Sequence, residues 1–141
     1  MIMLEPLRKY AVFSGRARRL EFWSFMLFVW LVTAVLLWLS MAPTVTFASD
    51  DYSAYVFQYY AYASREPWAT AALVFSAAML IPGVAVMVRR LHDIDRSGWW
   101  CIIGLTLVGT IILVVFALLD GTQGPNRFGP DPKGRPTPMP G

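Results

Sequence analysis

The stretch FWSFMLFVWLVTAVLLWLSM, residues 22–41, contains 20 residues and no charged side chain. An α-helix rises about 1.5 Å per residue, so this stretch is long enough to cross the roughly 30 Å hydrocarbon core of a bilayer. Two more uncharged, apolar blocks follow at residues 68–88 and 99–119. The chain is therefore predicted to be an all-α membrane protein with three transmembrane helices.

The composition of the whole chain excludes the other broad classes. Of its 141 residues, 57% are apolar and 15% are charged, against about 45–50% and about 25% in soluble domains. Three apolar helices in so short a chain would leave too few polar residues to cover them in water. The first block is also longer than the apolar core of about 7–15 residues in a signal peptide, so we expect it to remain as an uncleaved span.

Lysine and arginine counts predict the orientation of the spans. Five such residues precede the first span, one lies in the loop 42–67, and three lie in the loop 89–98. Because positively charged loops stay in the cytoplasm, the N-terminus and the loop 89–98 are predicted inside and the loop 42–67 outside. Three spans then place the C-terminal tail outside.

The C-terminal tail carries a feature that conflicts with this topology. Arg127, Lys133 and Arg135 make it basic, which favours the inner side. The alternative is a third block that bends back as a re-entrant hairpin and returns the tail to the cytoplasm. The sequence leaves both topologies open. Its prolines and glycines predict a disordered end at 133–141, after a single membrane domain at 1–132.

The first loop is rich in tyrosine. Tyr52, Tyr55, Tyr59, Tyr60 and Tyr62 recur at spacings near three and four. This spacing predicts a short amphipathic helix at the outer headgroup level, where tyrosine side chains prefer to lie. Anchoring in the membrane interface is the simpler interpretation, and a stacking platform for a ligand ring is the alternative.

Two polar clusters flank the spans on the predicted inner side, GRARRLEFW at 15–23 and RRLHDIDRSGWW at 89–100. An Arg–Asp network that fixes the turn between helices is one interpretation of the second cluster, because aspartate accepts paired hydrogen bonds from arginine. A site for lipid headgroups or phosphate on the arginines is another. A metal or proton site centred on His92 is the third. One histidine and one cysteine do not form a zinc site.

A third polar block, GTQGPNRFGPDP, lies at 121–132. With the three blocks in this order, the chain resembles the YhaH-like family of small bacterial inner-membrane proteins, a family of unknown function. The resemblance covers residues 10–132. It implies an integral protein of the bacterial cytoplasmic (inner) membrane and no established activity.

The motifs present do not point to an enzyme. No nucleophile elbow, phosphate-binding loop or metal motif occurs, so no catalytic, metal or cofactor residue is assigned. A net charge of +3, with basic residues beside the spans, does not favour nucleic acid as a partner. We expect a structural module, or one that binds anionic membrane lipids, a membrane-protein partner or a second copy of the chain. A subunit of a small oligomeric transporter or channel is the alternative.

The residues on which such a function would depend form one candidate polar cluster. If the tail returns to the inner side, Asn126, Arg127 and Asp131 join the residues that flank the spans. The full candidate set consists of Arg16, Arg19, Arg89, Arg90, His92, Asp93, Arg96, Asn126, Arg127 and Asp131.

Overall fold

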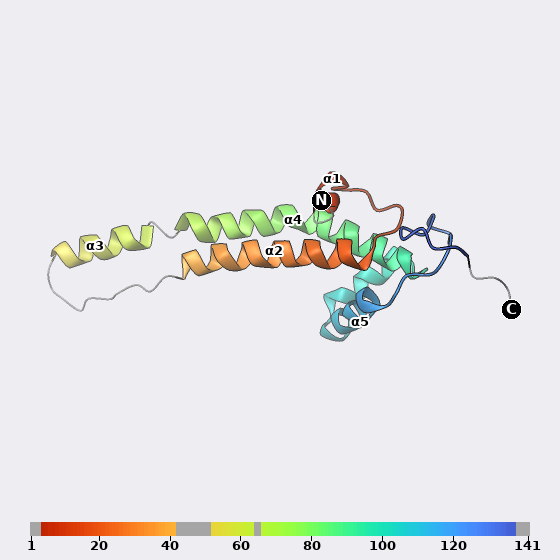
Figure 1. Cartoon of the computed structure of the whole chain (residues 1–141). Helices are drawn as coiled ribbons and strands as arrows, with labels where there is room; N and C mark the ends of the chain where they lie inside the picture. Colours follow the sequence, from red (N-terminus) through yellow and green to blue (C-terminus); the bar gives the residue numbers. More distant parts are fainter. Residues whose placement is uncertain (1–3, 42–51, 64–65, 138–141) are drawn as a thin grey trace. The chain divides into compact units, whose positions relative to one another are not determined.

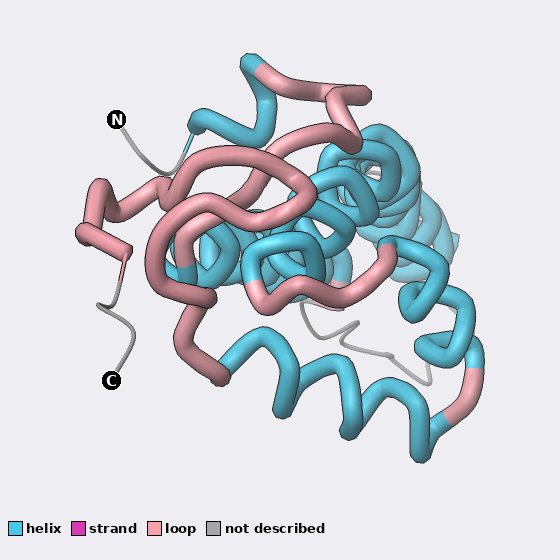
Figure 2. The backbone as a smooth tube through the Cα atoms, turned by 90° about the vertical axis from the view of Figure 1, so that its right-hand side faces the viewer, coloured by secondary structure: helices cyan, strands magenta, loops and turns pink. Residues whose placement is uncertain are grey.

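The computed structural model describes residues 4–41, 52–63 and 66–137. Figures 1 and 2 show that this part of the chain consists of helices and loops, and its only strand-like pairing is an isolated bridge between Asn126 and Gly129. The helices in chain order are α1 Glu5–Arg8, α2 Arg19–Ser40, α3 Tyr52–Ala63, α4 Glu66–Asp93, the 3-10 helix η2 Gly98–Leu105, and α5 Leu107–Leu118.

The chain divides into two compact units. Unit 1 is formed by Met1–Phe28 and Leu80–Gly141, and unit 2 is formed by Val29–Met79. The long helices α2 and α4 contribute to both units. Unit 1 contains the beginning of α2, the end of α4, η2, α5 and the C-terminal segment, and it holds all the candidate polar residues.

Two helices are long and apolar enough to cross a membrane, Arg19–Ser40 and Pro67–Asp93. Only 11% and 22% of their most apolar windows are buried inside the protein. A core helix of a soluble protein would instead bury most of such a window, so these helices are suited to a lipid environment. They correspond to the first two predicted spans.

Unit 2 exposes most of its large side chains. Trp38 is 73% exposed and Leu73 is 71% exposed, whereas the small side chain of Ala72 is 3% exposed. Within the tyrosine-rich loop, Tyr52–Ala63 form the helix α3, with Tyr52 80% exposed, and the amphipathic character of this helix stays a prediction. The placement of α3 at the outer headgroup level stays a prediction.

The third predicted span is not one continuous helix, so a third transmembrane helix is not confirmed. The block divides at Thr106, whose backbone is extended, into η2 and the 12-residue helix α5. At about 1.5 Å per residue α5 is about 18 Å long, which is short of the roughly 30 Å core. The break is stabilised locally, because the Thr106 hydroxyl accepts a hydrogen bond from the Gly109 amide at 3.0 Å and so caps α5.

After this break α5 packs against η2. The rings of Trp100 and Phe116 meet edge to face, with centroids 5.6 Å apart. The approach is closest at Gly109, where an added Cβ would lie 1.7 Å from the Ile103 carbonyl oxygen. A glycine at this position is therefore required for the chain to fold back on itself.

Replacement of Gly109 by alanine is expected to destabilise the protein by about 1–3 kcal/mol, because the methyl group would force the chain apart at Ile103. Gly83→Ala is the matched control, since its Cβ would meet only Met26 at an ordinary 3.8 Å. That change within α4 is expected to leave stability unchanged or raise it by up to about 1 kcal/mol. Thermal unfolding in detergent measures both, and equal melting temperatures for the two variants would contradict the tight turn.

Candidate functional site

The centre of the polar site is the carboxylate of Asp93, at the end of α4. Its Oδ1 accepts a hydrogen bond from Nε of Arg16 at 2.9 Å, and its Oδ2 accepts one from Nη1 of Arg90 at 2.5 Å. The three side chains are each at most 2% exposed. A buried carboxylate is stabilised by two guanidinium partners through both charge and hydrogen bonding.

Arg16 also connects this centre to the C-terminal segment. Its Nη1 donates to the carbonyl oxygen of Gly124 at 2.7 Å, and its Nη2 donates to that of Thr122 at 2.6 Å. The Thr122 amide in turn donates to the Asp93 carbonyl at 2.9 Å. One guanidinium therefore joins residues from the beginning, the middle and the end of the chain.

Arg90 and Arg19 bind the C-terminal end of α5. Arg90 donates from Nε to the Ala117 carbonyl at 3.2 Å and from Nη2 to the Leu119 carbonyl, and Arg19 donates to the Leu118 carbonyl at 3.2 Å. The last carbonyls of a helix have no partner within the helix, and they carry the negative end of its dipole. These arginines supply both the hydrogen bonds and the compensating charge.

Gly121 lies directly against the Asp93 carboxylate. A Cβ at this position would be 2.1 Å from Oδ2 of Asp93. The C-terminal segment can therefore pass this close to the carboxylate only because residue 121 has no side chain.

A second buried ion pair ties α4 to the beginning of α2. Nη1 of Arg89 donates to Oε1 of Glu21 at 2.7 Å, and the Arg89 carbonyl accepts from the Ala17 amide at 3.0 Å. Among the described residues, Arg89 alone has buried side-chain nitrogens, Nε and Nη2, without a hydrogen-bond partner.

The outer part of the site consists of charges from the C-terminal segment. Arg135 donates to Oδ2 of Asp131 at 2.7 Å and to the Gly121 carbonyl at 2.9 Å. The hydrogen bond from Arg135 lowers the pKa of Asp131 to about 2, so this carboxylate stays ionised. Arg135 lies within the stretch predicted to be disordered. The structure describes that stretch up to residue 137, and residues 138–141 lie outside the described part.

His92 lies at the side of the network and is held by two contacts. Its Nδ1 is 3.1 Å from the Gly15 carbonyl oxygen, and its ring stacks on Phe128 with centroids 3.9 Å apart. A carbonyl oxygen only accepts hydrogen bonds, so Nδ1 carries a proton. Within the described part of the chain, no group of three potential metal ligands surrounds His92 or any other residue.

The structure brings most of the candidate residues into unit 1 as one network, but in different roles. Arg16, Arg90 and Asp93 form its centre. Asn126 donates from its side chain to the His92 carbonyl at 2.9 Å, and Asp131 lies 3.9 Å from Arg16.

Three further candidates form contacts with other partners than the central residues or the tail carbonyls. Arg127 pairs with Asp95 at 3.1 Å in a solvent-exposed contact, where ion pairs contribute little. Arg96 lies instead over the rings of Trp100 and Phe116, 5.8 Å from each centroid. Arg89 forms its separate pair with Glu21.

The sequence interpretation missed four contributors to the site: Glu21, Thr122, Gly124 and Arg135. Glu21 is the only acidic residue in the block 15–23, so the sequence could have predicted that it pairs with an arginine. Thr122 and Gly124 act through backbone carbonyls, which the side-chain pattern does not reveal.

The structure combines two long apolar helices with a buried polar network. These features are typical of a small α-helical integral membrane protein. The family model described as protein of unknown function (DUF805) matches residues 10–130, and the chain belongs to this family. The match agrees with the resemblance drawn from the three sequence blocks, which is thereby confirmed.

Two relatives from Escherichia coli (strain K12) place the chain in the bacterial inner membrane. The chain is 37% identical to the inner membrane protein YhaH over 134 residues, which cover 94% of this chain and 97% of the relative. It is 33% identical to the inner membrane protein YhaI over 133 residues, which cover 92% and 93%. No solved structure matches the chain.

Asp93→Asn is expected to destabilise the protein by about 3–5 kcal/mol, because it removes the charge of the carboxylate to which two buried guanidinium groups are hydrogen-bonded. Asp95→Asn is the matched control two residues away. It removes only an exposed partner of Arg127 and is expected to cost about 1 kcal/mol or less. Thermal unfolding in detergent compares the two, and a similar small loss for both variants would show that the buried network contributes little.

Proposed function

We propose that the chain is a non-enzymatic inner-membrane module with both ends of its sequence in the cytoplasm. The supporting observation is the guanidinium of Arg16, which bonds at once to Asp93 and to the carbonyls of Thr122 and Gly124. Groups bonded to one buried side chain lie on the same side of a bilayer. The N-terminal segment and the C-terminal tail then share the side that positive-charge counting assigns to the cytoplasm.

The third apolar block is, in this proposal, a re-entrant hairpin. Its two halves, η2 and α5, pack against each other, and its end at Leu119 is bound by Arg90 next to Asp93. A hairpin that begins and ends at the same polar centre returns the chain to the side it left. Two full spans and one re-entrant segment also place the basic residues Arg127, Lys133 and Arg135 inside.

The saturation of the polar groups supports a structural role for the network. The Asp93 carboxylate has two cationic partners, and Arg16 and Arg90 use their donors on carbonyls of the chain. General acid–base chemistry requires a group that can reach a substrate. The uncharged composition of residues 22–41 and 68–88 likewise favours a structural role over an ion pathway.

Binding of anionic lipid is assigned in this proposal to the exposed arginines of the inner rim. Arg89 and Arg90 are at most 1% exposed at their side chains, so headgroups do not reach them. Arg127 is 61% exposed at its side chain, and Arg18 and Arg96 are also exposed. Each such cation near the membrane surface contributes about 1 kcal/mol to the free energy of binding to anionic lipid.

The topology is tested by reporters fused after Gly141. A fused green fluorescent protein is expected to fluoresce and a fused alkaline phosphatase to be inactive, because the former requires a cytoplasmic and the latter a periplasmic location. The same reporters inserted in the loop 42–51 are the control and are expected to give the opposite result. Phosphatase activity at the C-terminus would contradict the proposed topology.

Lipid binding is tested with Arg18, Arg96 and Arg127 replaced together by Gln. The protein is expected to lose roughly 100-fold in its preference for phosphatidylglycerol over phosphatidylcholine, measured by competition for lipid retained on the purified protein. High salt should reduce the preference of the unchanged protein in the same way. An unchanged preference in a variant with normal melting temperature would count against these arginines as the lipid contacts.

A further inference from the structure

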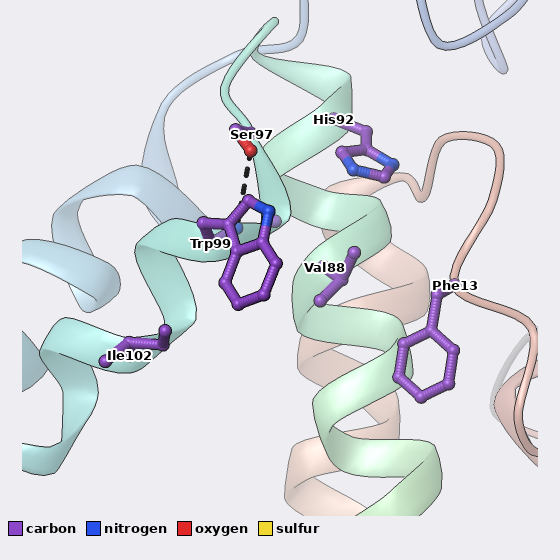
Figure 3. A pocket seen from close by; sticks show the side chains of 7 residues that line it. Phe13, Val88, His92, Ser97, Trp99 and Ile102 are labelled. Atoms are coloured by element: carbon purple, nitrogen blue, oxygen red, sulfur yellow. Dashed lines mark hydrogen bonds between the residues drawn. The ribbon is translucent and has the colours of Figure 1, made fainter.

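Unit 1 contains a pocket beside the polar network, with a volume of about 540 Å³. Figure 3 shows that its walls come from three segments: Phe13 before α2, Val88 and His92 on the last turns of α4, and Trp99 and Ile102 on η2. Small-molecule sites typically occupy about 300–1,000 Å³, and they combine apolar and aromatic walls with a few polar groups. The pocket has this size and this composition.

The polar group of interest in this pocket is the Nε2 atom of His92. The ring is already oriented by the hydrogen bond from Nδ1 to the Gly15 carbonyl and by stacking on Phe128. Because Nδ1 carries a proton, the neutral ring has its lone pair on Nε2. Among the described residues, no hydrogen bond to Nε2 is found, so this acceptor is oriented and unused.

Gly98 keeps Nε2 accessible from the pocket. A Cβ on Gly98 would lie 3.5 Å from Nε2 of His92 and 2.7 Å from Cγ1 of Val88. Any side chain at this position would therefore occupy the space in front of the acceptor. The missing side chain leaves room for an external group to reach it.

The lining restricts the chemistry of such a group. None of the described residues that line the pocket carries a full charge, which favours a neutral ligand. Trp99 is 79% exposed and Ile102 is 55% exposed on the apolar helix η2, so the pocket borders an exposed apolar surface, which suits a ligand dissolved in the membrane. An acceptor at its polar end requires a hydrogen-bond donor on the ligand.

From these observations we propose that the pocket binds a neutral, membrane-dissolved amphiphile that ends in a hydroxyl group. The hydroxyl group donates a hydrogen bond to Nε2 of His92, and the apolar body lies on Phe13, Trp99 and Ile102. An aliphatic alcohol such as a diacylglycerol and an alkylated phenol share this chemistry. The proposal does not depend on the role of the arginines or on the side of the C-terminal tail.

The test uses the chain's single histidine as its own reporter. Untagged full-length protein labelled with ¹⁵N-histidine in detergent micelles gives one Nε2 resonance. It is titrated with 4-nonylphenol, and in a parallel arm with dioctanoylglycerol, to distinguish the two sources. The matched probe is 4-nonylanisole, which has the same apolar body but no hydroxyl donor. The Nε2 resonance is expected to move upfield with a hydroxyl-bearing probe and to stay in place with the anisole.

Two glycine variants separate the pocket from general partitioning into the micelle. Gly98→Ala fills the space before Nε2 and is expected to abolish the shift, while Gly83→Ala, which meets only Met26, is expected to retain it. If Gly98→Ala does not fold, Trp99→Ala removes an exposed wall instead and should weaken binding about tenfold.

Three results would overturn the proposal. The first is an equal shift with the anisole, the second is no shift with either hydroxyl probe, and the third is unchanged affinity in Trp99→Ala. A shift in only one of the two hydroxyl arms supports the site and identifies the source of its ligand.

Discussion

The buried carboxylate of Asp93 is the constraint to which the rest of unit 1 conforms. Burial of a charge is costly unless it is paired and hydrogen-bonded, and here two arginines meet that requirement, one on each oxygen. The arginines then need acceptors for their remaining donors. The carbonyl oxygens of the C-terminal segment and of the end of α5 accept these hydrogen bonds. The path of the last quarter of the chain therefore follows from the charges on α4.

The fold of the third apolar block illustrates this dependence. Its composition suits a membrane span, yet it forms η2 and α5, with a break at Thr106 and a close approach at Gly109. The α5 helix ends where Arg90 and Arg19 bind its last carbonyls. A continuous helix of the same residues would carry its end across the bilayer, away from the charges that bind it here.

The polar residues near the end of α4 belong to two different environments, the buried network and the pocket. Arg16, Arg90 and Asp93 saturate one another and stabilise the fold, whereas His92 is oriented by its neighbours but keeps one nitrogen unused. Sequence proximity hides this difference, since His92 and Asp93 are adjacent. Side chains that follow each other on a helix point about 100° apart, so one faces the network and the other faces the pocket.

The sequence alone indicated the membrane environment and two helices able to span it, because length and lack of charge suffice for a helix in lipid. Its three polar blocks indicated the family. It also marked the polar residues near Asp93 as a set. Only the tertiary structure decided which of them are buried and that Thr122 and Gly124 take part through their carbonyls. Likewise, it divided the block 99–119 into two helices. These features depend on contacts between residues up to 108 positions apart, and local periodicity contains no information on such pairings.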